Sequence, residues 1–270
     1  MATMTAPNSA APPIPVKASG SHFYKYSAFI GERRGWLKEI IVEHRLYVPK
    51  LTQLDDPPDG RPKLARKSED ELYSFLYKGP FGVLSRYPHM TVEEQVKHGA
   101  ILDLSIKRHG AEGLMRAMAE TLYTKMDDWR IYSLSKRSDS PSLWAQYGDE
   151  HRGYCLEFAN EGAFFGSAME VIYGDSVEFD IDKPEHRNGY WFFCKKRDWS
   201  YQEEVRVLVP RLSDGRIQID PRWLTRIILG WKMPEVDRAR IREWGKQRSP
   251  GLKVVSTKYD VLDQVIRVED

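Results

Sequence analysis

The sequence has few cysteines, no excess of charge of either sign and no long apolar run, and each of these features excludes a class of protein. Only two of its 270 residues are cysteine, Cys155 and Cys194. Two thiols cannot build a disulfide framework or a metal cluster, so we expect two buried apolar side chains in a reducing cytoplasm. The 41 Lys and Arg nearly balance the 39 Asp and Glu, so the chain has no overall electrostatic field that would mark a nucleic-acid-binding or membrane-binding protein. No window approaches 18 apolar residues, the length of a membrane span.

The first 20 residues also lack the parts of a signal peptide. They are rich in Ala, Pro, Ser and Thr, with no basic start and no apolar centre. We therefore expect residues 1–20 to be a disordered leader. The remaining residues, 21–270, are expected to form a single domain, since an aromatic content of 12% can furnish one large core.

Local signals predict an α+β fold with mixed, mainly antiparallel sheets and a helical insertion over residues 68–126. Ser68 and Thr91 are each followed three residues later by glutamate, the capping-box pattern of a helix start. The second of these helices is expected to end at Gly110 and a third to follow up to Met126. Strands are predicted at 22–26, 46–48, 129–135, 152–158, 169–173, 202–209, 224–230, 253–258 and 261–268, with further helices near 36–41, 141–148 and 234–244.

The stretch from Lys195 to Val209 contains the best candidate site. Side chains alternate along a strand, so Gln202, Glu204 and Arg206 share one face, about 6–7 Å apart, while Val205, Val207 and Val209 face the core. An amide, a carboxylate and a guanidinium in a row suit a polar ligand. The alternative is an exposed edge strand with a weak surface ion pair.

A basic and aromatic run precedes this strand. Cationic donors and aromatic rings together suit phosphate-bearing or base-bearing ligands, although the run could equally be a solvated turn. The run consists of Lys195, Lys196, Arg197, Trp199 and Tyr201.

Two earlier segments supply further candidates. Ser133 and Ser135 point to the same side of a strand and can donate hydrogen bonds. Trp144 and Tyr147 lie on one face of a short helix. They could cover a flat ligand ring, but attachment of the helix to the sheet is the more common role. The acidic loop 54–60 lacks the spacing of a calcium site, so we predict no metal there.

Several motifs occur in the order found in the bacterial family catalogued as domain of unknown function 2971, which residues 22–230 resemble. The family usually has Asn, Phe and Glu where this chain has Asp55, Pro58 and Gln202. The motifs are Tyr24-Lys25-Tyr26, Leu46-Tyr47-Val48, Asp55-Asp56-Pro57-Pro58-Asp59, Ser133-Leu134-Ser135, Leu143-Trp144-Ala145-Gln146-Tyr147, His151-Arg152-Gly153, Val171-Ile172-Tyr173, Lys195 and Trp199-Ser200-Tyr201-Gln202-Glu203-Glu204-Val205-Arg206.

The same layout is similar to that of ADP-ribosyltransferases, which combine a basic or aromatic residue on an early strand, a Ser-x-Ser strand and a late Glu/Gln-x-Glu segment. That resemblance implies a split β-sandwich and NAD as substrate, and the residues themselves predict no metal. It also implies an acceptor that is a protein, a nucleic acid or a small molecule. A role as a toxin or phage-defence effector would fit, with a possible neutralising partner protein.

The resemblance also implies roles for individual residues. Glu204 would hold the ribose and stabilise its developing positive charge, and Gln202 would position the acceptor. The other implied roles are cofactor binding by the segment Tyr24-Lys25-Tyr26, in which Lys25 or Tyr26 holds the amide or phosphate side, bracing of the ribose by Ser133 and Ser135, stacking on nicotinamide by Trp144 or Tyr147, and pairing of Arg206 with phosphate or with Glu204.

Two other functions are compatible with the sequence. The same cleft could belong to a non-catalytic nucleotide-sensing module. Alternatively, Asp55, Asp56 and Glu204 could hold Mg²⁺ in a nuclease, but nothing in the sequence brings these acids together.

Overall fold

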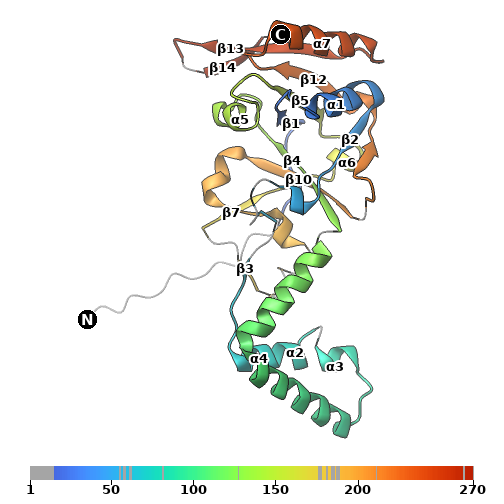
Figure 1. Ribbon diagram of the computed structural model, residues 1–270, viewed down its shortest axis with the longest axis vertical. Coiled ribbons are helices and arrows are strands. Elements are labelled where there is room, and N and C mark those ends of the chain that lie inside the picture. The colour runs from blue at the N-terminus through green and yellow to red at the C-terminus, as the bar shows by residue number, and fades with distance from the viewer. Residues whose placement is uncertain are drawn as a thin grey trace, which may run out of the picture.

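The fold is built on one large, mainly antiparallel sheet (Figure 1). The computed structural model describes residues 15–54, 56, 59–60, 63–80, 82–126, 128–175, 178–180, 182–183, 186, 189–210, 212–263 and 265–269. The eight strands follow the order β14-β13-β12-β5-β1-β4-β10-β6, and β12 and β13 are the parallel pair in it. Their bounds are β1 His22–Ser27, β4 Trp129–Ser135, β5 Tyr154–Ala159, β6 Met169–Glu170, β10 Glu204–Pro210, β12 Leu224–Leu229, β13 Lys253–Asp260 and β14 Val265–Glu269.

Shorter strands and helices surround this sheet, so the predicted α+β class is confirmed. Among the described residues, three two-stranded sheets pair β11 with β2, β3 with β8, and β7 with β9. The split β-sandwich stays a prediction. The remaining elements are β2 Arg45–Tyr47, β3 Lys63–Leu64, β7 Ile172–Gly174, β8 Glu178–Phe179, β9 Cys194–Lys196, β11 Arg216–Gln218, α1 Arg33–Lys38, α2 Glu69–Lys78, α3 Val83–Arg86, α4 Val92–Met126, α5 Pro141–Gln146, α6 Gly162–Phe165, α7 Glu235–Gln247, the π-helical turn η1 Glu39–Glu43, and the 3₁₀ turns η2 Leu51–Gln53, η4 Tyr190–Phe193, η5 Arg197–Gln202 and η6 Pro221–Trp223.

The predicted helical insertion is an arm of α2, α3 and α4 that extends from the sheet (Figure 1). Both capping boxes form, because the Ser68 and Thr91 hydroxyls accept from the backbone of the glutamates three residues later. Gly110 has φ 71° and ψ 157°, a conformation that glycine adopts readily, and it divides α4 at the predicted end of the second helix. No helix among the described residues is long and apolar enough to cross a membrane.

The two faces of the sheet differ in chemistry because side chains alternate along each strand. One face buries the main apolar cluster, which includes Val205 and Val207 of β10 and Leu134 of β4. The valines therefore face the core, as predicted. On the opposite face, α5 packs through Leu143 and Trp144. Glu204 and Arg206 of β10 and Ser133 and Ser135 of β4 lie on this second face.

Three predicted boundaries need correction. Gln202 ends η5, and Glu203 has φ 42°, so β10 begins only at Glu204. The last strand begins at Val265, since 261–263 form a turn in which Asp260 accepts the amides of Leu262 and Asp263. The predicted strand 169–173 is split into β6 and β7 at Val171.

The C-terminal end of the predicted leader packs against the sheet. Residues 1–14 lie outside the described residues. Lys17 forms a bridge with Met169, and the amide of Ala18 donates to the carbonyl of Ala168 over 2.8 Å. Ala18 itself is buried. The segment 16–18 therefore lies against the β6 edge of the sheet, and the folded part begins before residue 21.

Candidate functional site

A cavity of about 370 Å³ opens on the polar face of the sheet. Strands β1, β4 and β10 form its floor. Its walls come from α5, η5, Lys195 and, from the loop after η2, Leu54, Asp56 and Asp59. Every residue predicted for the site lines it except Trp144 and Arg206. The lining residues are Tyr24, Lys25, Tyr26, Leu54, Asp56, Asp59, Ser133, Leu134, Ser135, Leu143, Gln146, Tyr147, Lys195, Trp199, Gln202 and Glu204.

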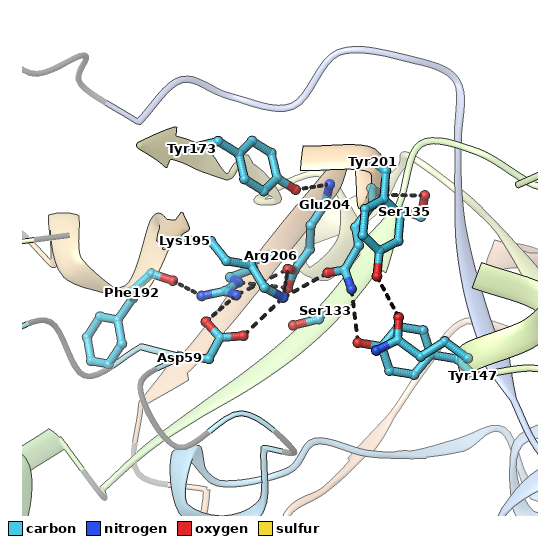
Figure 2. A network of polar contacts seen from close by, with 12 residues as sticks. Asp59, Ser133, Ser135, Tyr147, Tyr173, Phe192, Lys195, Tyr201, Glu204 and Arg206 are labelled. Atoms are coloured by element: carbon cyan, nitrogen blue, oxygen red, sulfur yellow. Dashed lines mark hydrogen bonds and ion pairs between the residues drawn. The ribbon is translucent and has the colours of Figure 1, made fainter. Parts of the chain in front are cut away.

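Two cations and two carboxylates form a buried network at one wall of the cavity (Figure 2). Arg206 Nε donates to Glu204 Oε1 over 2.8 Å, and its Nη2 reaches Asp59 Oδ1 at 2.6 Å and Glu204 Oε2 at 3.2 Å. Lys195 Nζ lies 2.8 Å from Glu204 Oε2 and 3.1 Å from Asp59 Oδ2. The carbonyl of Phe192 accepts from Arg206 Nη1 over 2.6 Å. Each charge therefore meets an opposite charge, and the formal sum of the network is zero.

Sheet register and chain turns position these side chains. Glu204 pairs with Ser135 and Arg206 with Ser133 across β10 and β4. Because they are two residues apart on one strand, both point to the same face, as the sequence predicts. The expected alternative, a weak surface ion pair, is wrong, since Arg206 is 0% exposed and Glu204 6%.

The neighbouring charges decide the ionisation state of the network. Burial alone would raise the pKa of the Glu204 carboxyl, but the charges of Arg206 and Lys195 outweigh burial and hold this pKa well below its ordinary value. Burial would likewise lower the pKa of Lys195, yet Glu204 and Asp59 raise it. Arg206 follows the same logic, and its pKa is raised. Glu204 is thus a carboxylate at neutral pH, fixed in orientation by a guanidinium fork.

A chain of hydrogen bonds ties η5 to α5 beside the network (Figure 2). Lys195 Nζ donates to Gln202 Oε1 over 2.8 Å, and Gln202 Nε2 donates to the Tyr147 hydroxyl over 3.0 Å. Burial raises the pKa of Tyr147, so its hydroxyl keeps its proton. Since that oxygen accepts from Gln202, its own proton can be donated into the cavity. Gln202 therefore bridges Lys195 and Tyr147, and its amide oxygen accepts one hydrogen bond, from Lys195, so its role in positioning an acceptor stays a prediction.

The serines and the first strand brace the cavity. Ser135 Oγ donates to the backbone carbonyl of Gln202 over 2.7 Å. Tyr24 and Tyr26 share the cavity face of β1 by alternation, and the Tyr26 hydroxyl donates to the carbonyl of Arg137 over 2.8 Å. The ammonium group of Lys25 instead lies 5.1 Å from the centroid of the Tyr132 ring, which belongs to the apolar cluster of the other face. Lys25 Nζ also donates to the carbonyl of Ser133 over 2.9 Å, and Lys25 lines the cavity, so its expected contact with a phosphate or an amide stays a prediction.

Trp144 is placed behind the cavity rather than in it. Its side chain is 0% exposed, its ring meets Tyr26 edge-on at 5.2 Å, and its Nε1 donates to the carbonyl of Ser138 over 3.0 Å. These contacts attach α5 to the sheet, so stacking of Trp144 on a ligand ring does not fit. Tyr147, one turn later on the same helix, does line the cavity.

Sequence reasoning missed Asp59 and gave Lys195 no specific role. Asp59 stands 147 residues before Arg206, and its only signal in the sequence is its place in the acidic motif of the resembled family. Tyr173 was also missed, and its hydroxyl accepts the backbone N–H of Glu204 over 2.8 Å. Asp55, which the nuclease hypothesis requires, lies outside the described residues.

In the described part of the chain, no group of three or more His, Cys, Asp or Glu side chains is arranged to hold a metal ion. Lys195 and Arg206 already occupy oxygen atoms of both Glu204 and Asp59. Comparison of the chain with protein-family models, curated proteins and solved structures gives no match in any of the three.

Proposed function

We propose that the cavity binds the nicotinamide–ribose end of NAD and that the protein cleaves the bond between these two groups, as an ADP-ribosyltransferase-like enzyme. The observation that carries the proposal is a permanently ionised, rigidly oriented carboxylate, Glu204, in the wall of a cavity lined by aromatic residues. Cleavage passes through a ribosyl cation, and a carboxylate placed where that charge develops lowers the barrier.

The bond that breaks joins the ring nitrogen of nicotinamide to C1′ of the ribose. Its electron pair leaves with the ring, which becomes neutral nicotinamide, and an acceptor then bonds to C1′ and loses a proton. Glu204 Oε1 accepts one hydrogen bond, from Arg206 Nε, so the oxygen keeps acceptor capacity for a ribose hydroxyl.

The rest of the cavity favours the ring end of the ligand over its diphosphate. Tyr24, Tyr26, Tyr147 and Trp199 supply aromatic surface for a flat ring. The three N–H bonds of Lys195 are directed at Gln202, Glu204 and Asp59. In this proposal the nicotinamide enters the cavity, the Tyr147 hydroxyl donates to its amide, and the diphosphate remains at the mouth.

The acceptor in this proposal is a protein, a nucleic acid or a small molecule. From the family resemblance we infer a cytoplasmic toxin or phage-defence effector, with a neutralising partner protein as a further expectation.

The first experiment measures nicotinamide release from NAD by the purified protein, with cell lysate as the source of acceptor. Glu204→Gln should reduce the rate about 100-fold or more, as does loss of other groups that stabilise transition-state charge. Glu157→Gln is the matched control, because Glu157 is an equally buried carboxylate paired with an arginine, Arg226, and does not line the cavity. Equal activity of native protein and Glu204→Gln would refute the catalytic role.

One observation favours a second candidate, a non-catalytic nucleotide sensor. Glu204 is neutralised by two cations, which weakens the field it could exert on a ribosyl cation. A sensor would bind NAD in calorimetry without releasing nicotinamide, and Glu204→Gln would change only the affinity. A metal-dependent nuclease is the remaining hypothesis, and it predicts nucleic-acid cleavage that stops when Mg²⁺ is removed by chelation.

A further inference from the structure

The first part of α4, residues 92–109, has one packed face and one exposed face. Gly99 lies on the face towards α2, where an added Cβ would come within 2.8 Å of the Tyr73 hydroxyl, and Ile106 is buried on the same face. The opposite face is exposed, and we call it the outer face of α4. It consists of Glu93, Lys97, Ala100, Ile101, Leu104 and Arg108.

The outer face combines an apolar centre with opposite charges at its two ends. Ile101 and Leu104 are 55% and 66% exposed, and Ala100 lies beside them. Glu93 stands near the start of the helix and Arg108 near the end of this part. Neither charge has an ion pair in the described part of the chain. The face therefore offers apolar surface and two unsatisfied charges of opposite sign.

The order of these residues makes the outer face self-complementary in an antiparallel pair. Glu93 and Arg108 lie equally far from the midpoint between Ala100 and Ile101. A two-fold axis through that midpoint places Glu93 of each copy opposite Arg108 of the other, while Ala100 and Ile101 each meet their own counterpart at the axis. A parallel pair would instead bring Glu93 against Glu93 and Arg108 against Arg108. Charge complementarity thus selects the antiparallel arrangement.

The contacts on either side of that axis are also favourable. Lys97 and Leu104 are equally far from the same midpoint, so Leu104 of each copy would lie on the aliphatic stem of Lys97 of the other. Figure 1 shows residues 92–109 at the end of the arm farthest from the sheet. A second copy can therefore approach the outer face without meeting the sheet.

We propose that the outer face of α4 is a dimer interface, through which two copies of this chain pair antiparallel about a two-fold axis. The exposed apolar centre requires a covering surface, and the paired charges match those of a second copy. One helix face from each copy makes a small interface, so we expect a weak dimer with a dissociation constant in the micromolar range.

Sedimentation velocity of the full chain, from low micromolar to near-millimolar concentration, measures the assembly. We expect the native protein to shift from monomer to dimer over this range. Leu104→Asp should abolish the shift. Leu262→Asp is the matched control, because it is the same change at an exposed leucine outside the arm, and it should leave the dimer intact. Both side chains are exposed, so thermal melting should show that both variants fold.

Charge reversal tests the pairing of Glu93 with Arg108. Glu93→Arg and Arg108→Glu should each weaken the dimer about 10-fold, because every dimer contains the pair twice. The double variant restores opposite charges across the interface and should recover the dimer, although its charges suit the helix dipole less well. A change in helix stability alone cannot produce that recovery. Arg116→Glu, at an exposed arginine beyond Gly110, is the control and should have no effect.

Disulfide trapping tests the orientation of the two helices. Ala100→Cys should form a covalent dimer under mild oxidation, because Ala100 lies beside its counterpart at the axis and the native Cys155 and Cys194 are buried. Glu93→Cys should cross-link to Arg108→Cys when the two variants are mixed, and not to itself.

Any of four results overturns the proposal. The first is a monomer over the whole concentration range, and the second is equal assembly of Leu104→Asp and Leu262→Asp. The third is a double charge variant that assembles no better than Glu93→Arg or Arg108→Glu. The fourth is self-cross-linking of Glu93→Cys, which would indicate a different arrangement of the helices.

Discussion

Replacing Arg206 by methionine should destabilise the fold severely. The Arg206 side chain is fully buried and donates to Glu204, Asp59 and the carbonyl of Phe192. In Arg206→Met, two buried carboxylates share the single charge of Lys195, so the network changes from a formal charge of zero to −1. Removing one partner of a buried ion pair costs about 3–5 kcal/mol, because the remaining charge stays desolvated.

That loss corresponds to a fall in Tm of roughly 6–20 °C for a chain of this size. Urea unfolding followed by tryptophan fluorescence, with thermal melting beside it, measures the loss. Arg222→Met is the matched control, because Arg222 pairs with Asp220 but its side chain is 79% exposed. The unfolding midpoint of Arg222→Met should therefore hardly differ from that of the native protein. If Arg206→Met fails to fold, Arg206→Lys keeps the charge without the fork and should lower Tm by less. Equal midpoints for Arg206→Met and Arg222→Met would refute the reasoning.

Three further predictions concern ionisation and backbone geometry. Because the folded-state pKa of Glu204 is depressed, the stability that this carboxylate contributes is present above its unfolded-state pKa of about 4.3 and is lost as the pH falls below that value. The urea unfolding midpoint should therefore fall less steeply between pH 5 and 3 in Glu204→Gln than in the native protein. Parallel pH profiles of the two proteins would contradict this. Gly110→Ala places a side chain at φ 71° and ψ 157° and should cost about 1–3 kcal/mol in urea unfolding, whereas Gly113→Ala, inside the helix, should not destabilise. Ser68→Ala removes the N-cap of α2 and should lower the stability of this helix by about 0.5–2 kcal/mol, which would be measured as faster amide hydrogen exchange in its first turn. Ser68→Asp, which can also cap the helix, should restore the protection of these amides from exchange.

The features that local rules determine could be predicted from the sequence. Both capping boxes and the break at Gly110 depend on residues within one helical turn, and the structure contains all three. Strand alternation placed Glu204 and Arg206 on one face and Val205 and Val207 in the core. These features require no knowledge of what packs against the segment.

The composition of the network could not be predicted, because it depends on contacts between distant segments. The loop that carries Asp59 has turn chemistry at almost every position, and nothing within it indicates that one carboxylate is buried against β10. Nor does the sequence indicate that Arg206 is buried, since side chains alternate in the same way in an exposed edge strand and in a strand whose face is covered by other segments.

The remaining errors have specific physical causes. The prediction for Gln202 assumed continuous strand geometry, and the left-handed backbone of Glu203 interrupts it. Trp144 was assigned a ligand contact together with Tyr147 because the two share a helix face. In the structure Trp144 packs on Tyr26, whereas Tyr147 lines the cavity.

The balanced charge of the network determines how the Glu204→Gln experiment must be interpreted. The substitution removes one negative charge and leaves Arg206 and Lys195 facing Asp59 alone, so the formal charge rises from zero to +1. A net positive wall attracts the diphosphate of NAD, and the affinity for NAD should hold or rise even as the transition state loses its carboxylate. An enzyme would therefore show a fall in kcat without a rise in KM. A sensor would show a change in Kd with no turnover in either protein. A loss of both binding and stability would instead mean that Glu204 serves mainly to hold the two cations in the fold.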